Sequence, residues 1–135
     1  MTGPSTVESV GDSSYAVVTT YKRDGTPVPT AVWVVRDGDA LAFWTVTGSG
    51  KVKRIRRDGT VLIGPSDVRG RPTGPPLKGH AVILDAAGGE HVRDLLRRKY
   101  GLMGRLTLFF SRLRRGADGT IGIRVTLDPA AGQDG

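Results

Sequence analysis

Short segments rich in β-branched and aromatic residues, separated by glycine-containing turns, constrain the fold of this chain most. Residues 14–22 (SYAVVTTYK), 28–35 (VPTAVWVV) and 40–47 (ALAFWTVT) have the composition of β-strands. Asp24-Gly25 and Asp37-Gly38 separate them, and Asp-Gly pairs favour type I′ turns, whose two central residues need positive φ. The pattern predicts an antiparallel meander. Pro29 has no N–H to donate, so the second strand should begin at an edge or a bulge.

The remainder of the chain predicts three more strands and three helices. The strands are expected at residues 60–66, 78–84 and 120–127, and the Gly/Pro-rich residues 67–76 form a loop between the first two. Apolar residues at helical spacing indicate helices at 51–57, 89–100 and 106–114. We therefore expect a mainly β (α+β) fold, a small antiparallel barrel forming a single domain over residues 1–135. Residues 1–13 and 128–135 are expected to be flexible.

Composition limits the partners that the protein can have. The chain has no cysteine, which excludes disulfides and thiol catalysis and is compatible with a cytoplasmic location. It contains neither a secretory signal pattern nor an apolar run of about 20 residues, so no membrane association is expected. The net charge of +7 predicts an anionic partner. A nucleic-acid-binding barrel is a remote possibility, because the aromatic residues lie in apolar strands while the basic residues cluster elsewhere.

The common catalytic signatures are absent from the sequence. His80 and His91 lack metal-ligand spacing, so we expect no metal site. No nucleophile elbow, P-loop or dinucleotide-binding glycine motif is present. The catalytic residues therefore stay unidentified at this level.

One basic segment, KVKRIRR at residues 51–57, follows the small-residue turn Gly48-Ser49-Gly50. Ser49 suits the N-cap of a helix, and Val52 and Ile55 would anchor that helix in the core. Lys51 and Arg54 share another face near the N-terminus, where the helix dipole disfavours cations by about 0.3–1 kcal/mol each. An anion bound at residues 48–51, most simply a phosphate, would remove this unfavourable arrangement.

The sequence also resembles a known family over residues 15–127. GTPVPTAVW and SGKVKRIRR, together with RRKYGLMGRL, are similar to segments of the PPOX-class F420-dependent oxidoreductases. These are split β-barrel flavin- and deazaflavin-dependent reductases of the superfamily that includes pyridoxamine 5′-phosphate oxidase. The resemblance implies a split β-barrel and a homodimer with the cofactor at the subunit interface.

The resemblance also implies which residues hold the cofactor. The tricyclic ring would lie against the second strand, and the phosphate would lie at the end of the third strand and the following turn. Pyridoxamine phosphate oxidases have Ser-Arg-Lys at that turn, where this chain has Ser49-Gly50-Lys51. The expected cofactor-binding residues are Pro29, Thr30, Ala31, Val32, Thr45, Thr47, Ser49, Gly50, Lys51, Lys53 and Arg54.

The activity that the resemblance implies is hydride transfer between reduced F420 and an unsaturated organic small molecule. The alternative cofactor is FMN, as in pyridoxamine phosphate oxidases. FMN is disfavoured by the missing arginine at position 50, whereas the additional Lys53, Arg56 and Arg57 suit the anionic tail of F420. Tyr15, Tyr21 or Tyr100 is a candidate proton donor, and Trp33 and Trp44 line either the substrate cavity or the barrel core.

Overall fold

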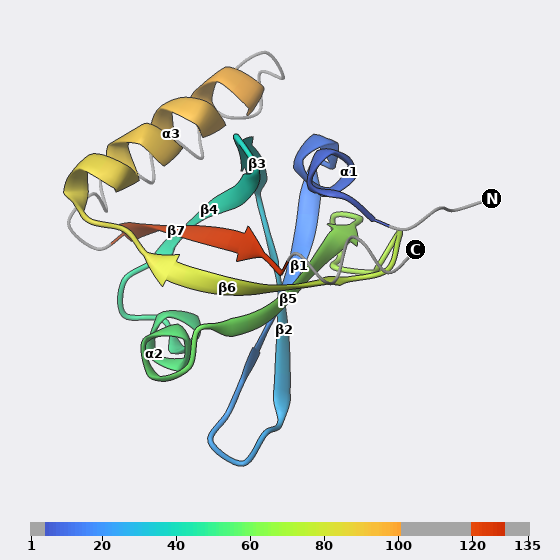
Figure 1. Cartoon of the computed structure of the whole chain (residues 1–135), viewed down its shortest axis with the longest axis vertical. Helices are drawn as coiled ribbons and strands as arrows, with labels where there is room; N and C mark the ends of the chain where they lie inside the picture. Colours follow the sequence, from blue (N-terminus) through green and yellow to red (C-terminus); the bar gives the residue numbers. More distant parts are fainter. Residues whose placement is uncertain (1–4, 101–119, 129–135) are drawn as a thin grey trace.

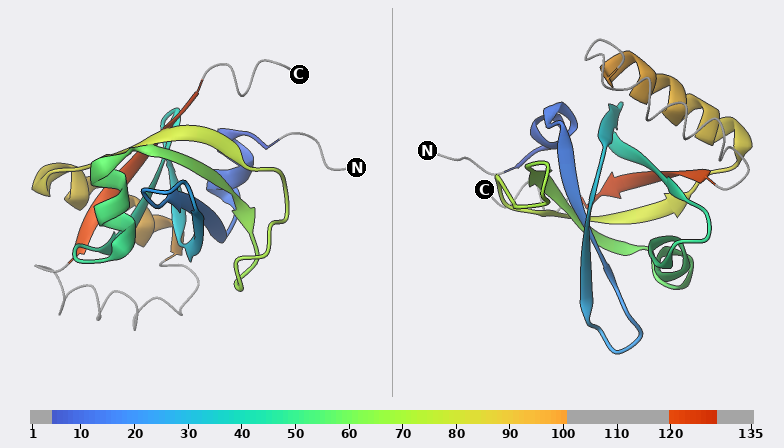
Figure 2. Two further views of the ribbon diagram at one scale, coloured as in Figure 1. Left: turned by 90° about the horizontal axis from the view of Figure 1, so that it is seen from below. Right: turned by 180° about the vertical axis from the view of Figure 1, so that it is seen from behind.

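One antiparallel sheet of seven strands curls on itself in the structure, a computed structural model that describes residues 5–100 and 120–128 (Figures 1 and 2). The strand order is β2-β1-β5-β6-β7-β4-β3. The strands are β1 (Tyr15–Tyr21), β2 (Pro27–Val32), β3 (Val34–Asp37), β4 (Ala40–Val46), β5 (Thr60–Ser66), β6 (Leu77–Ile83) and β7 (Thr120–Leu127), and the helices are α1 (Val7–Asp12), α2 (Gly50–Arg57) and α3 (Ala86–Tyr100).

The predicted second strand is divided in two, which corrects both the strand count and the predicted meander. Trp33 lies between β2 and β3, and the two halves have different partners. β2 pairs with β1, whereas β3 pairs with β4. Consecutive strands therefore form the two ends of the sheet, which makes the structure a split barrel. Pro29 lies on the end strand β2, as its missing N–H predicted.

Alternating residues of the strands fill the barrel. Ala16, Val18 and Thr20 of β1 are at most 1% exposed, which shows that this face of the strand points into the barrel. Val10 of α1 and Val52 of α2 enter the same core from different ends of the molecule (Figure 1). Both helices therefore cover the barrel rather than stand apart from it.

A second, smaller core lies outside the barrel. Val35 and Ala42, on β3 and β4, pack there against Val92, Leu96 and Tyr100 of α3. Figure 1 shows α3 beside β3 and β4 on this outer side. The helical spacing that predicted a helix at 89–100 is confirmed, although the helix begins earlier, at Ala86.

Two local predictions need correction. No element is expected before Ser14 from the sequence, but Val7–Asp12 form α1, with Thr6 and Ser9 in a reciprocal capping box. Among the described residues only glycines, including Gly25 and Gly38, have positive φ, so the first two Asp-Gly turns are not type I′. The predicted helix at 106–114 lies outside the described residues.

Candidate functional site

The split of the barrel leaves two strand edges without a ladder. β3 pairs with β4 only as far as Phe43, and residues 44–46 of β4 pair only with β7 among the described residues. β2, which directly precedes Trp33 in the chain, pairs with β1 and contacts β4 without pairing with it. We call these two unpaired edges, β2 and residues 44–46, the seam. Unpaired strand edges present backbone donors and acceptors that a ligand can use.

The start of α2 adjoins the β4 edge of the seam and has the predicted geometry. The Oγ of Ser49 accepts a hydrogen bond from the N–H of Val52 at 3.3 Å, which confirms Ser49 as the N-cap. Val52 and Ile55 are 0% and 4% exposed and anchor the helix in the barrel core. A Cβ built on Gly50 would lie 2.7 Å from Nη1 of Arg54. The Arg54 guanidinium therefore lies over the first residue of the helix.

Lys51 and Arg54 lie side by side as the helical spacing predicted. The Nζ of Lys51 donates to Oγ1 of Thr45 at 3.5 Å and lies 5.9 Å from the ring centroid of Phe43. The Nε of Arg54 donates to Oγ1 of Thr20 at 2.6 Å. Burial, and then the positive charge of Arg54, lower the pKa of Lys51 below its ordinary value. Both causes show that the free site disfavours the positive charge on this ammonium.

In the described part of the chain, neither of these two cations forms an ion pair with a carboxylate. Two adjacent cations, both half-buried, repel one another at the end of a helix that already carries a positive partial charge. An anion with several acceptor oxygens would attract both cations and the positive end of the helix, and so offset both the mutual repulsion and the unfavourable interaction with the dipole. The residues present therefore fit a phosphate group.

Thr20 is a member of this cluster that sequence reasoning missed. It is 1% exposed on the inward face of β1 and positions the Arg54 guanidinium through its hydroxyl. The signal was a polar residue at the end of an alternating apolar face, following Ala16 and Val18.

The predicted residues of the second strand do not share one face. Thr30 and Val32 point inward, Val32 being 7% exposed in the barrel core, whereas Pro29 and Ala31 are exposed on the outer face. A ring lying against β2 cannot contact all four side chains on one side of the strand. It can contact one pair together with the strand's unpaired backbone edge.

The outer face of β2 borders a cavity of about 250 Å³. Gly70 approaches from the β5–β6 loop, where an added Cβ would lie 3.5 Å from Cβ of Ala31. The lining residues are Val17, Thr19, Pro29, Leu62, Gly64, Gly70, Pro72, Gly74 and Pro76. These walls are mostly apolar and suit a flat organic ring rather than a charged group.

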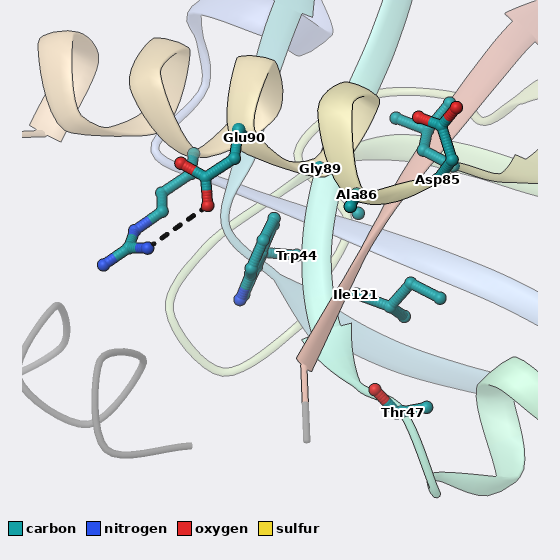
Figure 3. A pocket seen from close by; sticks show the side chains of 10 residues that line it. Trp44, Thr47, Asp85, Ala86, Gly89, Glu90 and Ile121 are labelled. Carbon is teal, nitrogen blue, oxygen red and sulfur yellow. Dashed lines mark hydrogen bonds and ion pairs between the residues drawn. The ribbon is translucent and has the colours of Figure 1, made fainter. Parts of the chain in front are cut away.

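Thr47 borders a different cavity, and Lys53 lies on a different face of α2. The Lys53 side chain is exposed on a different face of α2, as its spacing from Lys51 requires. Thr47 lines a second cavity of about 350 Å³ between the first turns of α3 and the ends of β4 and β7. Figure 3 shows the indole of Trp44 in this cavity, beneath Gly89. Trp44 is therefore a cavity residue and not part of the barrel core.

Trp33 and Tyr100 belong to the contact between α3 and the barrel. Their rings stack with centroids 5.0 Å apart, and the hydroxyl of Tyr100 is bonded to the backbone of Ser14 and Val34. Burial raises the pKa of Tyr100 above its ordinary value. Tyr100 is thus unsuited to donating a proton to a substrate, which leaves Tyr15 and Tyr21 as the tyrosine candidates.

Neither a cluster of candidate metal ligands nor a membrane-spanning helix is found among the residues that the structure describes. No cluster of three or more His, Asp or Glu side chains in residues 5–100 and 120–128 could hold a metal ion. None of the described helices is long and apolar enough to cross a membrane.

Comparison with known proteins gives structural neighbours only. No protein-family model matches the chain, and neither does any curated protein. A conserved hypothetical protein of Mycobacterium tuberculosis superposes with a TM-score of 0.67 at 20% identity, over 90% of this chain and 77% of that one. An F420 reductase superposes with a TM-score of 0.57 at 21% identity, over 93% of this chain and 96% of that one.

A candidate pyridoxamine 5′-phosphate oxidase from Listeria innocua is a third neighbour. It superposes with a TM-score of 0.56 at 14% identity, over 85% of this chain and 84% of that chain. Identities this low establish the fold alone. The superpositions and the division of the second strand at Trp33 together show that this chain has the split-barrel fold of the pyridoxamine 5′-phosphate oxidase-like proteins.

Proposed function

We propose that the protein is an F420-dependent oxidoreductase that transfers a hydride between the reduced coenzyme and an unsaturated organic small molecule. The observation that carries the proposal is the pair formed by Lys51 and Arg54, two adjacent cations without a carboxylate partner in the described residues. They lie where the seam meets the start of α2. The F420 reductase among the neighbours supports the choice of coenzyme, as does the resemblance of the sequence.

In this proposal the bound coenzyme supplies the hydride chemistry, and the protein supplies binding and orientation. Lys51, Arg54, Ser49 and the backbone of Gly50 would hold the phosphate, with Thr45 and Thr20 fixing the two cationic side chains through their hydroxyls. The unpaired edge of β2, with Pro29 and Ala31 on its outer face, would orient the ring. The substrate then needs no acid–base dyad from the protein.

Other cations could contact a longer anionic tail. Lys53, Arg56 and Arg57 are exposed on α2, and Nη2 of Arg57 donates to the backbone oxygen of Tyr21 at 2.5 Å. This bond holds one cation of the group beside the β1–β2 hairpin. Glutamates of the coenzyme tail would meet these charges in water, where each contact contributes little and is screened by salt.

FMN is the second candidate, and one observation favours it. The Arg54 guanidinium lies over Gly50, so a guanidinium is present near the position where the oxidases have an arginine. The missing arginine at position 50 is therefore a weaker argument against FMN than the sequence suggests. Both coenzymes would place a phosphate at the same cations.

A titration of the purified protein with F420, FMN and FAD, followed by fluorescence, tests the proposal. Lys51→Ala should weaken F420 binding by about 1.5–3 kcal/mol, the range for charged hydrogen bonds. Lys53→Ala is the matched control on the same helix, and its smaller effect should fade with added salt. Tight FMN binding without F420 binding would contradict the choice of coenzyme.

The deazaflavin ring system without its phosphate and tail separates the two parts of the site. Wild type and Lys51→Ala should bind this fragment equally, because the deleted ammonium has no partner in it. If the fragment loses as much affinity as the whole coenzyme, Lys51 acts on the ring or on folding, and the phosphate assignment is wrong.

A further inference from the structure

At Val34, the outer edge of β3 is bonded by side-chain atoms of α3 instead of another strand. β3 is the last strand in the sheet order, and Val34 is its first residue. The N–H of Val34 donates to the Tyr100 hydroxyl at 3.1 Å, and its carbonyl accepts from Nζ of Lys99 at 2.7 Å. The backbone groups that a neighbouring strand would have bonded are thus satisfied by two consecutive residues at the end of α3.

The same two side chains also contact the chain just before β1. The Nζ of Lys99 donates to the carbonyls of Gly11 and Ser13, each at 2.6 Å. The Tyr100 hydroxyl lies 2.7 Å from the carbonyl oxygen of Ser14 and 2.8 Å from that of Val34. Its single proton can be donated to only one of these carbonyls at a time. Lys99, in contrast, has three donors for three carbonyls.

This arrangement bridges one half of the split between the two ends of the sheet. On one side of Trp33, Lys99 and Tyr100 join β3 to the segment that leads into β1. On the other side of Trp33, no ladder joins β2 to β4 in the part of the chain that the structure describes, and this is the seam. Trp33 itself is held between the two halves, stacked on Tyr100 at 5.0 Å and edge-on to Tyr15 at 6.4 Å.

We propose that Lys99 and Tyr100 are positioning residues for the seam: by bonding Val34 to the start of β1, they fix the point at which β2 diverges from β4. The inference deepens the proposed function, since its ligand arm rests on a coenzyme at the seam. Only Trp33 separates the clamped residue Val34 from Val32, the last residue of β2. A shift of Val34 is therefore passed directly to the strand against which the ring would lie.

Hydrogen exchange on the ligand-free protein tests the clamp without reference to any coenzyme. Tyr100→Phe keeps the stacked ring and deletes only the hydroxyl, and Lys99→Met keeps most of the aliphatic stem. In both variants the amide hydrogens of β2 should exchange about fivefold faster than in wild type, the change that corresponds to the loss of one ordinary hydrogen bond. The amides of β6 and β7 should stay at wild-type rates.

Val92→Ala is the matched control. Val92 is 0% exposed in the same outer core as Tyr100 but forms none of the bonds to Val34. It should destabilise the packing of α3 and leave the exchange of β2 unchanged relative to β6 and β7. Wild-type β2 exchange in Tyr100→Phe and Lys99→Met would overturn the inference, as would equal acceleration of β2 in Val92→Ala.

The affinities of the same variants for F420 and FMN complete the test. The affinities are measured at a temperature where all variants are folded, with whichever coenzyme wild type binds. Tyr100→Phe and Lys99→Met should bind that coenzyme at least about fivefold more weakly than wild type does, and Val92→Ala should bind it with wild-type affinity. Faster β2 exchange with unchanged affinity would show that the clamp does not position the seam. If wild type binds neither coenzyme, the proposed function fails, and the exchange experiment still decides whether the clamp holds β2.

Discussion

At the scale of single residues, the site is defined by charges in unfavourable places. Lys51 is half-buried beside Arg54 at the positive end of α2, and its pKa is lowered by burial and by that neighbouring cation. A bound anion would favour the protonated ammonium and raise this pKa again. Binding of an anion and protonation of Lys51 are therefore coupled.

The first prediction is a pH dependence of coenzyme affinity. As the pH rises through the lowered pKa of Lys51, the free protein loses the ammonium that the anion needs, so affinity should fall. Lys51→Arg stays charged in this range and should remove that part of the dependence. Isothermal titration calorimetry across neutral and alkaline pH measures the coenzyme affinity of both proteins. An equal decline of affinity with pH in wild type and Lys51→Arg would contradict the assignment of Lys51 as a phosphate ligand.

The second prediction concerns Gly50. In Gly50→Ala the new Cβ would lie 2.7 Å from Nη1 of Arg54, the far end of a flexible side chain, so the guanidinium has to move. Coenzyme affinity should fall, while thermal stability stays level or rises because alanine favours helix over glycine. Gly48→Ala is the control, since an added Cβ there meets no atom within 4 Å. Equal affinity losses in both variants would exclude a specific role for the Arg54 position.

At the scale of elements, α3 is joined to the barrel by both apolar packing and one half-buried cation, Lys99. Burial lowers the pKa of Lys99 to about 8 although Asp12 opposes this shift. The folded protein therefore releases this proton at lower pH than the unfolded chain, in which lysine has its ordinary value of 10.5. Where folded and unfolded states differ in bound protons, stability depends on pH.

The third prediction follows from that difference. Between about pH 8 and about pH 10.5 the unfolded state binds more protons at Lys99, so this group's contribution to the free energy of unfolding rises with pH. Below about pH 8 both states are protonated and the contribution is flat. Urea titrations of wild type and Lys99→Met should show a stability difference that shifts in favour of wild type across this window. A difference independent of pH would contradict the lowered pKa.

At the scale of the whole molecule, the outer edge of β2 bears on assembly. β2 ends the sheet and has an unpaired edge among the described residues, and edges of this kind favour pairing or coverage. The family resemblance implies a homodimer with the cofactor between the subunits. The apolar face that the sequence predicts at residues 106–114 also favours a dimer.

The fourth prediction is that the protein is a dimer and that dilution to the monomer abolishes coenzyme binding. Light scattering at several concentrations, combined with coenzyme titration at each, measures both properties. A monomer that binds coenzyme with full affinity would refute the prediction.

Local pattern alone determined most of the elements and the cation pair. The β-branched and aromatic composition of residues 14–22 predicted a strand there, and the spacing of Val52, Ile55, Lys51 and Arg54 predicted the faces of α2. These features depend on residues a few positions apart, whose relative directions follow from helix and strand geometry. The N-cap at Ser49 is local in the same sense.

Tertiary structure decided where the barrel splits and which residues meet across it. The segment 28–35 reads as one strand, and only the choice of partners, β1 for one half and β4 for the other, divides it at Trp33. The contact of Arg54 with Thr20 joins residues 34 positions apart, and Lys99 reaches carbonyls more than 60 positions away. Such contacts depend on how the sheet closes, and closure is a property of all seven strands together, which no local periodicity encodes.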